Sequence, residues 1–126
     1  GYRPAGYPGD RPLIPHGTSV ILNSPAVFRF TGQACPERHL RAAEVLGASV
    51  AGVKLEDAGK VLADQVTSFM QRLNVPNGLR AIGFGSSDIP ALVKGTLPQH
   101  RVTKLSPRPA DEEALAAMFE DAMTAW

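Results

Sequence analysis

The sequence is short of several features that would point to particular classes of protein. It has a single cysteine, Cys35, which excludes an internal disulfide and is consistent with a reducing compartment. No run of about 18 apolar residues occurs, so we expect no segment to cross a membrane. Thirteen Lys and Arg against twelve Asp and Glu leave a formal net charge of +1, without the basic excess that indicates nucleic-acid binding. We therefore expect neither a membrane nor a nucleic acid as partner.

Motifs of the common catalytic sites are also missing. Gly83-Phe84-Gly85 lacks the third glycine of a dinucleotide-binding loop and the basic residue that follows a phosphate loop. No Gly-x-Ser-x-Gly elbow of a serine hydrolase occurs. The three histidines, His16, His39 and His100, are far apart and contain no i, i+4 pair, so we do not expect this chain alone to complete a metal site. We interpret His39 as a partly exposed surface histidine.

What the sequence does have is helical periodicity. Forty-four per cent of its residues are hydrophobic and 20% are charged, as in ordinary globular domains. Strand signals are almost absent, because no hairpin dipeptide stands between alternating segments. The sequence predicts an all-α, bundle-like single domain over residues 1–126 with five or six helices. We expect helices over 17–32, 36–46, 55–73, 88–97 and from 111 onward, with a single turn or an extended connector at 79–84 and irregular chain at 98–109.

Two of these segments carry stronger expectations. The segment 17–32 is apolar on nearly every face, which predicts a buried central helix, and we expect Pro25 to interrupt it with Ser24 as a cap. The segment 55–73 is the longest periodic one. Gly59 within it costs helix stability, which indicates a close approach to another helix.

The N-terminal residues 1–15 are rich in proline and glycine and predict an irregular loop that leads into the first helix. His16 stands at the start of that helix, so its imidazole is placed by the backbone. It is a candidate metal ligand, although a lone histidine is more often a capping or packing residue. The chain opens at Gly1 on a long irregular segment, which indicates either a processed terminus or the second part of a longer protein, and we expect a C-terminal piece of a longer protein.

Several stretches resemble the C-terminal helical domain of the iron-containing (group III) alcohol dehydrogenases. They are Pro15-His16-Gly17 before an apolar helix with an inner proline, Asn74 to Arg80, Ser87 to Leu92, and Pro107-Arg108-Pro109 before an acidic helix start. The resemblance implies a two-domain, dehydroquinate synthase-like architecture whose N-terminal NAD-binding domain is absent here. It also implies a divalent metal, Fe²⁺ or Zn²⁺, held by one aspartate and three histidines. The last of these histidines matches His16. Because the other metal ligands and the NAD site would lie outside these 126 residues, the resemblance implies that the isolated chain is inactive.

The runs 10–17, 36–40 and 89–105 are similar to one branch of that family, which transfers hydride between a hydroxyacid and a 2-oxoacid. The resemblance implies 4-hydroxybutyrate-like and 2-oxoglutarate-like substrates, NAD as hydride carrier and the metal as Lewis acid. Such substrates bear carboxylates that need cationic partners. The segment 99–104 falls where related dehydrogenases line the substrate channel, so the resemblance implies that Arg101 and, less firmly, Lys104 bind the substrate carboxylate, and the alternative is a solvated basic loop.

Two other functions stay open. The chain could belong to an ordinary iron- or zinc-dependent alcohol dehydrogenase of the same family. It could instead be a non-catalytic helical interaction module, whose exposed apolar surface around Val20 and Ile21 a partner or a homodimer would cover. The high alanine content is consistent with a bacterial, cytoplasmic protein, and an animal member of the family would be mitochondrial.

Overall fold

The structure, a computed structural model, describes residues 13–126, so residues 1–12 of the predicted N-terminal loop lie outside the described part. The described residues form six α-helices and three short 3₁₀ turns, without a strand, which confirms the all-α prediction. The helices are α1 (His16–Gly32), α2 (Pro36–Val45), α3 (Ala58–Arg72), α4 (Ile89–Thr96), α5 (His100–Thr103) and α6 (Glu112–Asp121), and the 3₁₀ turns are η1 (Leu55–Asp57), η2 (Arg80–Ile82) and η3 (Ser86–Asp88).

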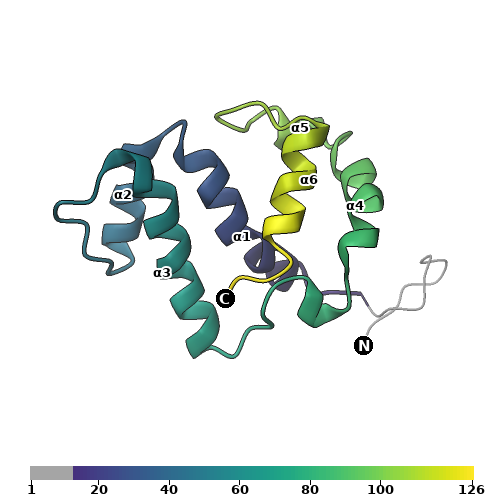
Figure 1. Ribbon diagram of the computed structural model, residues 1–126, viewed down its shortest axis with the longest axis horizontal. Coiled ribbons are helices and arrows are strands. Elements are labelled where there is room, and N and C mark those ends of the chain that lie inside the picture. Colours follow the sequence, from purple (N-terminus) through teal and green to yellow (C-terminus); the bar gives the residue numbers. More distant parts are fainter. Residues whose placement is uncertain (1–12) are drawn as a thin grey trace.

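Helix α1 lies at the centre of the molecule and divides it into two halves (Figure 1). On one side α1 packs against α3, which in turn packs against α2. On the other side α6 contacts both α1 and α4, and the short α5 lies at the end of that half (Figure 1). The core between these elements contains nine buried side chains: Leu22, Ala26, Ala43, Leu62, Val66, Met70, Leu79, Ala122 and Met123.

The first helix runs through Pro25 without a break, so the predicted interruption is wrong. Proline removes one backbone donor, but the ring is buried against the core and the helix continues on both sides. Ser24 does not cap a new helix. Its hydroxyl donates to the Val20 carbonyl at 2.9 Å, and the Asn23 amide donates to the Ser19 carbonyl at 2.8 Å. Both side chains are thereby used within α1.

The expected burial of α1 on every face is also wrong. Leu22 is 0% exposed and Ala26 2%, whereas Val20 is 51% and Val27 37% exposed. The buried residues face α3 and the core, and the two valines lie on the side of α1 toward α4, α5 and α6. Apolar composition alone did not reveal this difference, because both faces carry the same kinds of side chain.

Two glycines bring α1 and α3 into close contact. A Cβ atom on Gly32 would lie only 2.4 Å from the Gly59 Cα, and a Cβ on Gly59 would lie 2.7 Å from the Phe28 carbonyl oxygen. This confirms the close approach expected from Gly59. Helix α3 is shorter than the predicted segment 55–73. The leucines at the two ends of that segment, Leu55 and Leu73, lie outside α3 and are exposed.

His39 is buried, with 8% of its surface exposed, so its interpretation as a surface histidine is wrong. Its Nε2 lies 2.8 Å from the Thr31 hydroxyl, and its Nδ1 lies 3.0 Å from the Cys35 carbonyl oxygen. The ring also stands edge-on to Phe28 at a centroid distance of 6.0 Å. These partners satisfy both ring nitrogens, which makes burial of the imidazole acceptable.

The half of the molecule that contains α4, α5 and α6 differs from the prediction at one segment. Residues 98–109 were expected to be irregular, but four of them form the helix α5. The segment 79–84 contains the single turn η2. Helix α6 begins as expected after Asp111, whose Oδ1 accepts the Ala114 N–H at 2.9 Å.

The last residues of the sequence are held by the turn that follows α3. Asn77 Oδ1 accepts the backbone N–H groups of Ala125 at 2.8 Å and Trp126 at 3.1 Å. Next to it, the Leu79 N–H donates to the Ala122 carbonyl at 2.9 Å. Gly78 has a φ of 70° and lies so close to the Met123 carbonyl that a Cβ atom there would clash at 2.4 Å. The turn and the end of the chain therefore form one unit.

Candidate functional site

A groove of about 690 Å³ runs between α1 and the second half of the molecule. Helix α1 forms one wall, and residues of α4, α5, α6 and the segment before α5 form the other. His16 lies at the start of α1 and contributes the one imidazole among the described lining residues. The lining residues are His16, Ser19, Val20, Asn23, Ser24, Val27, Phe28, Leu92, Thr96, Gln99, Val102, Leu115, Met118 and Phe119.

The backbone fixes the position of His16. It is the first residue of α1 and follows Pro15, whose carbonyl accepts the Ser19 N–H at 3.0 Å. The Ser19 hydroxyl donates to the His16 carbonyl oxygen at 2.8 Å. The imidazole itself is exposed and forms no hydrogen bond or ion pair with another described residue. This leaves both ring nitrogens of His16 available at the groove.

The polar side chains along the α1 wall direct their donors back into the helix. Ser19, Asn23 and Ser24 each donate to a backbone carbonyl three or four residues earlier. On the opposite wall Gln99 lies with its amide 3.5 Å from the Gly95 carbonyl. No lysine or arginine is among the described residues that line the groove. The walls therefore present mainly carbon surface, and they lack a cation for an anionic group.

By themselves, the described residues do not fit a metal ion. Residues 13–126 contain no group of three or more His, Cys, Asp and Glu side chains close enough to share one. A protein-bound metal of the kind that histidines hold normally has three or four ligands. His16 fits as one nitrogen donor, and the other ligands would have to come from outside the described residues.

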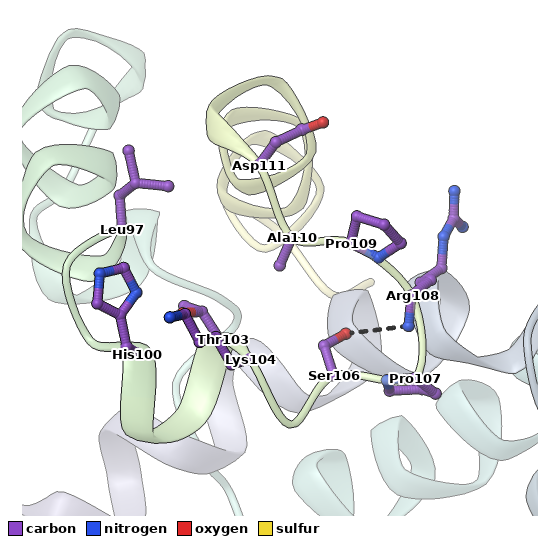
Figure 2. Close-up of a pocket in the computed structure, with 10 residues that line it drawn as sticks. All are labelled: Leu97, His100, Thr103, Lys104, Ser106, Pro107, Arg108, Pro109, Ala110 and Asp111. Atoms are coloured by element: carbon purple, nitrogen blue, oxygen red, sulfur yellow. Dashed lines mark hydrogen bonds between the residues drawn. The ribbon is translucent and has the colours of Figure 1, made fainter.

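The two basic residues assigned to substrate binding lie at α5, between two hollows. Arg101 is exposed, and it is not among the residues that line either hollow. Lys104 lines the second hollow, of about 490 Å³, together with His100 and Arg108 (Figure 2). Neither Arg101 nor Lys104 forms an ion pair with another described residue. Val102, the neighbour of Arg101 in the sequence, lines the His16 groove, whereas neither Arg101 nor Lys104 is among the described residues that line it.

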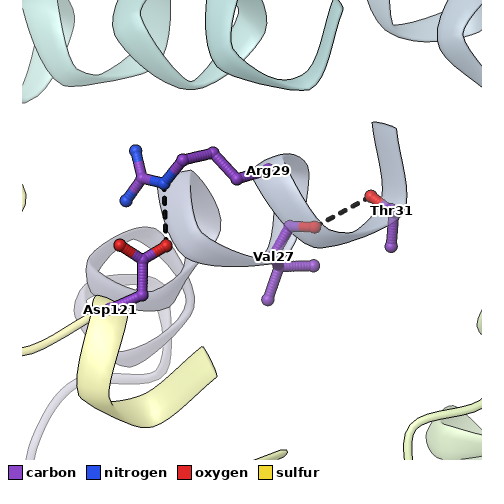
Figure 3. A network of polar contacts seen from close by, with 4 residues as sticks. All are labelled: Val27, Arg29, Thr31 and Asp121. Carbon is purple, nitrogen blue, oxygen red and sulfur yellow. Dashed lines mark hydrogen bonds and ion pairs between the residues drawn. The ribbon is translucent and has the colours of Figure 1, made fainter. Parts of the chain in front are cut away.

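Two other arginines hold the halves of the molecule together. Figure 2 shows the guanidinium of Arg108 pointing away from His100 and Lys104, and it donates to the Phe30 carbonyl at 3.0 Å and to Gln33 Oε1 at 2.7 Å. Arg29 Nε lies 2.7 Å from Asp121 Oδ2, which joins α1 to the end of α6 (Figure 3). These contacts join α1 to α6 and to the segment that precedes α6.

Sequence reasoning missed most of the groove. Val27, Val102 and the apolar side chains of α6 line it, but they come from elements far apart in the sequence. Val102 lies in the segment expected to be irregular, so no periodicity marked it. One signal was present, namely that the first helix is apolar on nearly every face, which is more apolar surface than packing against α3 uses.

None of the helices among residues 13–126 has the length and apolar character needed to cross a lipid bilayer.

Comparisons with known proteins agree on one family. Residues 11–123 match the family model described as "Fe-containing alcohol dehydrogenase family, C-terminal". A solved structure, described as "Crystal structure analysis of 1,3-propanediol oxidoreductase", is similar with a TM-score of 0.78 and 28% identity. That similarity covers 86% of this chain and 28% of the other.

Curated relatives are more similar in sequence. A mitochondrial hydroxyacid-oxoacid transhydrogenase of Xenopus laevis is 62% identical over 97% of this chain, and that of Homo sapiens is 57% identical over the same share. A probable mitochondrial hydroxyacid-oxoacid transhydrogenase of Dictyostelium discoideum is 54% identical over 98% of the chain. This chain spans 26% of the length of the Xenopus and human relatives and 23% of the Dictyostelium one.

Proposed function

Since this chain belongs to the Fe-containing alcohol dehydrogenase family, whose C-terminal domain it matches, we propose that it is the helical domain of an NAD-linked hydroxyacid-oxoacid transhydrogenase. The complete protein transfers hydride between a 4-hydroxybutyrate-like hydroxyacid and a 2-oxoglutarate-like 2-oxoacid. The observation that carries the proposal is the unpaired imidazole of His16 at an apolar groove, in a chain 62% identical to a named transhydrogenase. The rest of the protein supplies the remaining metal ligands and the NAD site.

The described residues have three tasks in this reaction. His16 donates one nitrogen to the metal, and Pro15 and Ser19 fix the helix start that carries it. The apolar walls of the groove exclude water from the reacting carbon. A divalent metal, Fe²⁺ or Zn²⁺, held in part by His16 would supply Lewis-acid chemistry at the substrate oxygen, and NAD bound by the rest of the protein would supply the hydride-carrying chemistry.

Arg101 and Lys104 have the task of binding the substrate carboxylate. Both lie at α5, whose Val102 lines the groove, and neither is neutralised by an ion pair with another described residue. A carboxylate held at the edge of the groove would meet their positive charge while the rest of the substrate lies inside. This position is compatible with an otherwise apolar groove.

The metal assignment is tested with His16→Ala in the complete protein. We expect the metal content, measured by elemental analysis, to fall well below that of the wild type, since a direct ligand is lost. Hydride transfer should fall by more than the roughly 10- to 100-fold that loss of a residue behind a ligand costs. His100→Ala is the matched control, because this exposed histidine lies outside the groove. Unchanged metal content in His16→Ala would overturn the assignment.

The carboxylate assignment is tested with Arg101→Ala. The KM for 2-oxoglutarate should rise by about tenfold or more, the effect of a lost charge-assisted hydrogen bond. The KM for an uncharged alcohol should stay the same. Lys104→Ala should show the same selectivity with a smaller rise, and equal effects on both substrates would reject the assignment.

An ordinary alcohol dehydrogenase of the same family is the second candidate, favoured by the similarity to a 1,3-propanediol oxidoreductase structure. A transhydrogenase keeps one NAD through both half-reactions, whereas a dehydrogenase releases it after each. Turnover of a hydroxyacid with a 2-oxoacid in the absence of added NAD therefore distinguishes the two. With regard to localisation, we propose mitochondria if the source is an animal, as the names of the relatives suggest, and the cytoplasm if it is a bacterium.

A further inference from the structure

An asparagine followed directly by a glycine stands in the turn after α3. In a flexible chain, Asn-Gly is the pair that deamidates most readily, because the glycine nitrogen carries no neighbouring side chain that hinders its approach to the asparagine Cγ. Asn77-Gly78 is the one such pair in the sequence. The other two asparagines are followed by a serine and a valine, whose side chains slow the approach. The sequence thus contains one position of high intrinsic reactivity.

In the structure, both reacting groups of this pair are held by other partners. The Asn77 oxygen accepts the N–H groups of Ala125 at 2.8 Å and Trp126 at 3.1 Å, and its nitrogen donates to the Trp126 carbonyl. The Gly78 N–H donates to the Pro76 carbonyl at 2.9 Å. Attack on the Asn77 Cγ requires the amide to turn toward the Gly78 nitrogen, so these contacts oppose it.

The turn depends on both residues of the labile pair. Gly78 has a φ of 70°, and a Cβ atom there would lie 2.4 Å from the Met123 carbonyl oxygen, so another residue would displace the end of the chain. Asn77 has to be an amide, because its oxygen accepts two N–H groups while its nitrogen donates to a carbonyl. The two residues that close the turn are therefore the pair most prone to react with each other.

We propose that Asn77-Gly78 is a self-deamidation site, which the closed turn keeps from reacting and an open turn lets react. In the open turn the Gly78 nitrogen attacks the Asn77 Cγ. The new N–C bond forms, the bond from Cγ to Nδ2 breaks, and the Gly78 N–H proton leaves with the nitrogen as ammonia. Water then opens the succinimide ring at either carbonyl and leaves aspartate or isoaspartate. The reaction uses only this chain and water, so it does not depend on the proposed function.

Either product opposes closure of the turn. Aspartate has no donor for the Trp126 carbonyl and places a negative charge beside it. Isoaspartate adds one carbon to the backbone before Gly78, which already lies against the Met123 carbonyl. Because the ammonia is lost to solvent, the original amide does not return. Deamidation therefore changes the turn permanently.

The rate of the reaction is measured in the complete protein by mass spectrometry of the peptide that contains Asn77. A turn closes much faster than an amide reacts, so the observed rate follows the fraction of open turns. We expect the folded protein to deamidate Asn77 at least about tenfold more slowly than the same protein unfolded in urea. Ala125→Pro removes one N–H that Asn77 accepts and should raise the folded rate about fivefold, the factor for one hydrogen bond of about 1 kcal/mol.

Ala125→Ser is the matched control, because it changes the same residue and keeps its N–H. Asn74, which precedes a valine at the start of the same turn, is the internal control and should keep its amide in every variant. The comparison of folded with unfolded wild type needs no substitution, so it decides the case even if Ala125→Pro does not fold. A folded rate equal to or above the unfolded rate would overturn the proposal, as would equal rates in folded Ala125→Pro and Ala125→Ser.

The products are tested by limited digestion with trypsin after chromatography has separated the modified from the unmodified protein. Arg80 is exposed, and its backbone N–H donates to the Met123 carbonyl in the closed turn. We expect cleavage after Arg80 to be several-fold faster in the isoaspartyl form than in the unmodified protein. Cleavage after Arg38, an exposed arginine of α2, should not change. Equal cleavage after Arg80 in the two forms would overturn the permanent opening of the turn.

Discussion

The two sides of α1 use similar apolar residues for opposite purposes. On the side away from the groove the helix carries Leu22, which is buried in the core, and Gly32, where the backbones of α1 and α3 approach until no Cβ atom fits between them. Toward α4, α5 and α6 it carries Val20 and Val27, which remain exposed along a groove. One helix thus has a side that is closed by packing and a side that is left open.

The difference teaches where stability and binding reside in this domain. Side chains on the closed side have already gained their burial on folding, so removing them costs free energy of unfolding. Side chains on the open side have gained little, and their burial is available to a ligand. Substitutions on the two sides of α1 should therefore separate stability from binding.

The largest expected effect comes from the core residue of the closed side. Leu22→Ala should lower the free energy of unfolding by about 4 kcal/mol, because Leu22 is 0% exposed and a cavity would remain. Val20→Ala, two residues earlier on the open side, should change it by less than about 0.5 kcal/mol. Urea unfolding followed by circular dichroism measures both. Equal losses would show that the groove is closed in solution.

The next effect tests the contact between the two helix backbones. Gly32→Ala should lower the free energy of unfolding by about 3 kcal/mol, since the new Cβ would meet the Gly59 Cα at 2.4 Å and neither backbone can yield easily. Gly17→Ala is the control in the same helix, where nothing lies within 4 Å of the added atom. There we expect a gain of up to about 1 kcal/mol from helix propensity. A neutral Gly32→Ala would contradict the close approach.

The smallest effect concerns the ion pair that joins α1 to the end of α6. The side chains of Arg29 and Asp121 are 30% and 44% exposed, so solvent screens much of their attraction. Arg29→Ala should cost less than about 1 kcal/mol, and the loss should shrink in 1 M salt. A loss of several kcal/mol that does not depend on salt would show that Arg29 acts through packing of its alkyl stem instead.

Helical periodicity was sufficient to predict most elements but not their orientation. The helix starts at Pro36 and after Asp111 were found because proline and acidic residues mark a first turn. Helix α1 was predicted to break at Pro25, since the sequence alone does not show that other segments of the same chain bury the proline ring. His39 was misplaced for a related reason. Its partner Cys35 is local, but the Thr31 hydroxyl belongs to α1, so this contact depends on how α2 turns toward α1.

The candidate site was predictable only at one end. His16 was identified because a helix start and a family resemblance coincide there. The groove beyond it is assembled from four helices, and its length depends on how α5 and α6 cross α1, as does the absence of Lys and Arg among its described lining residues. No local pattern contains that information. The domain limits and the roles of His16, Arg101 and Lys104 stay predictions.

The turn at Asn77 has a consequence for the chain's slow motions. Residues outside helices and strands usually exchange their amide hydrogens with solvent quickly. The Ala125 and Trp126 amides instead donate to Asn77, and those of Leu79 and Arg80 donate to carbonyls of Ala122 and Met123. These four amides, nearly fifty residues apart in sequence, share one set of contacts. They should therefore be protected together and lose their protection in a single cooperative opening.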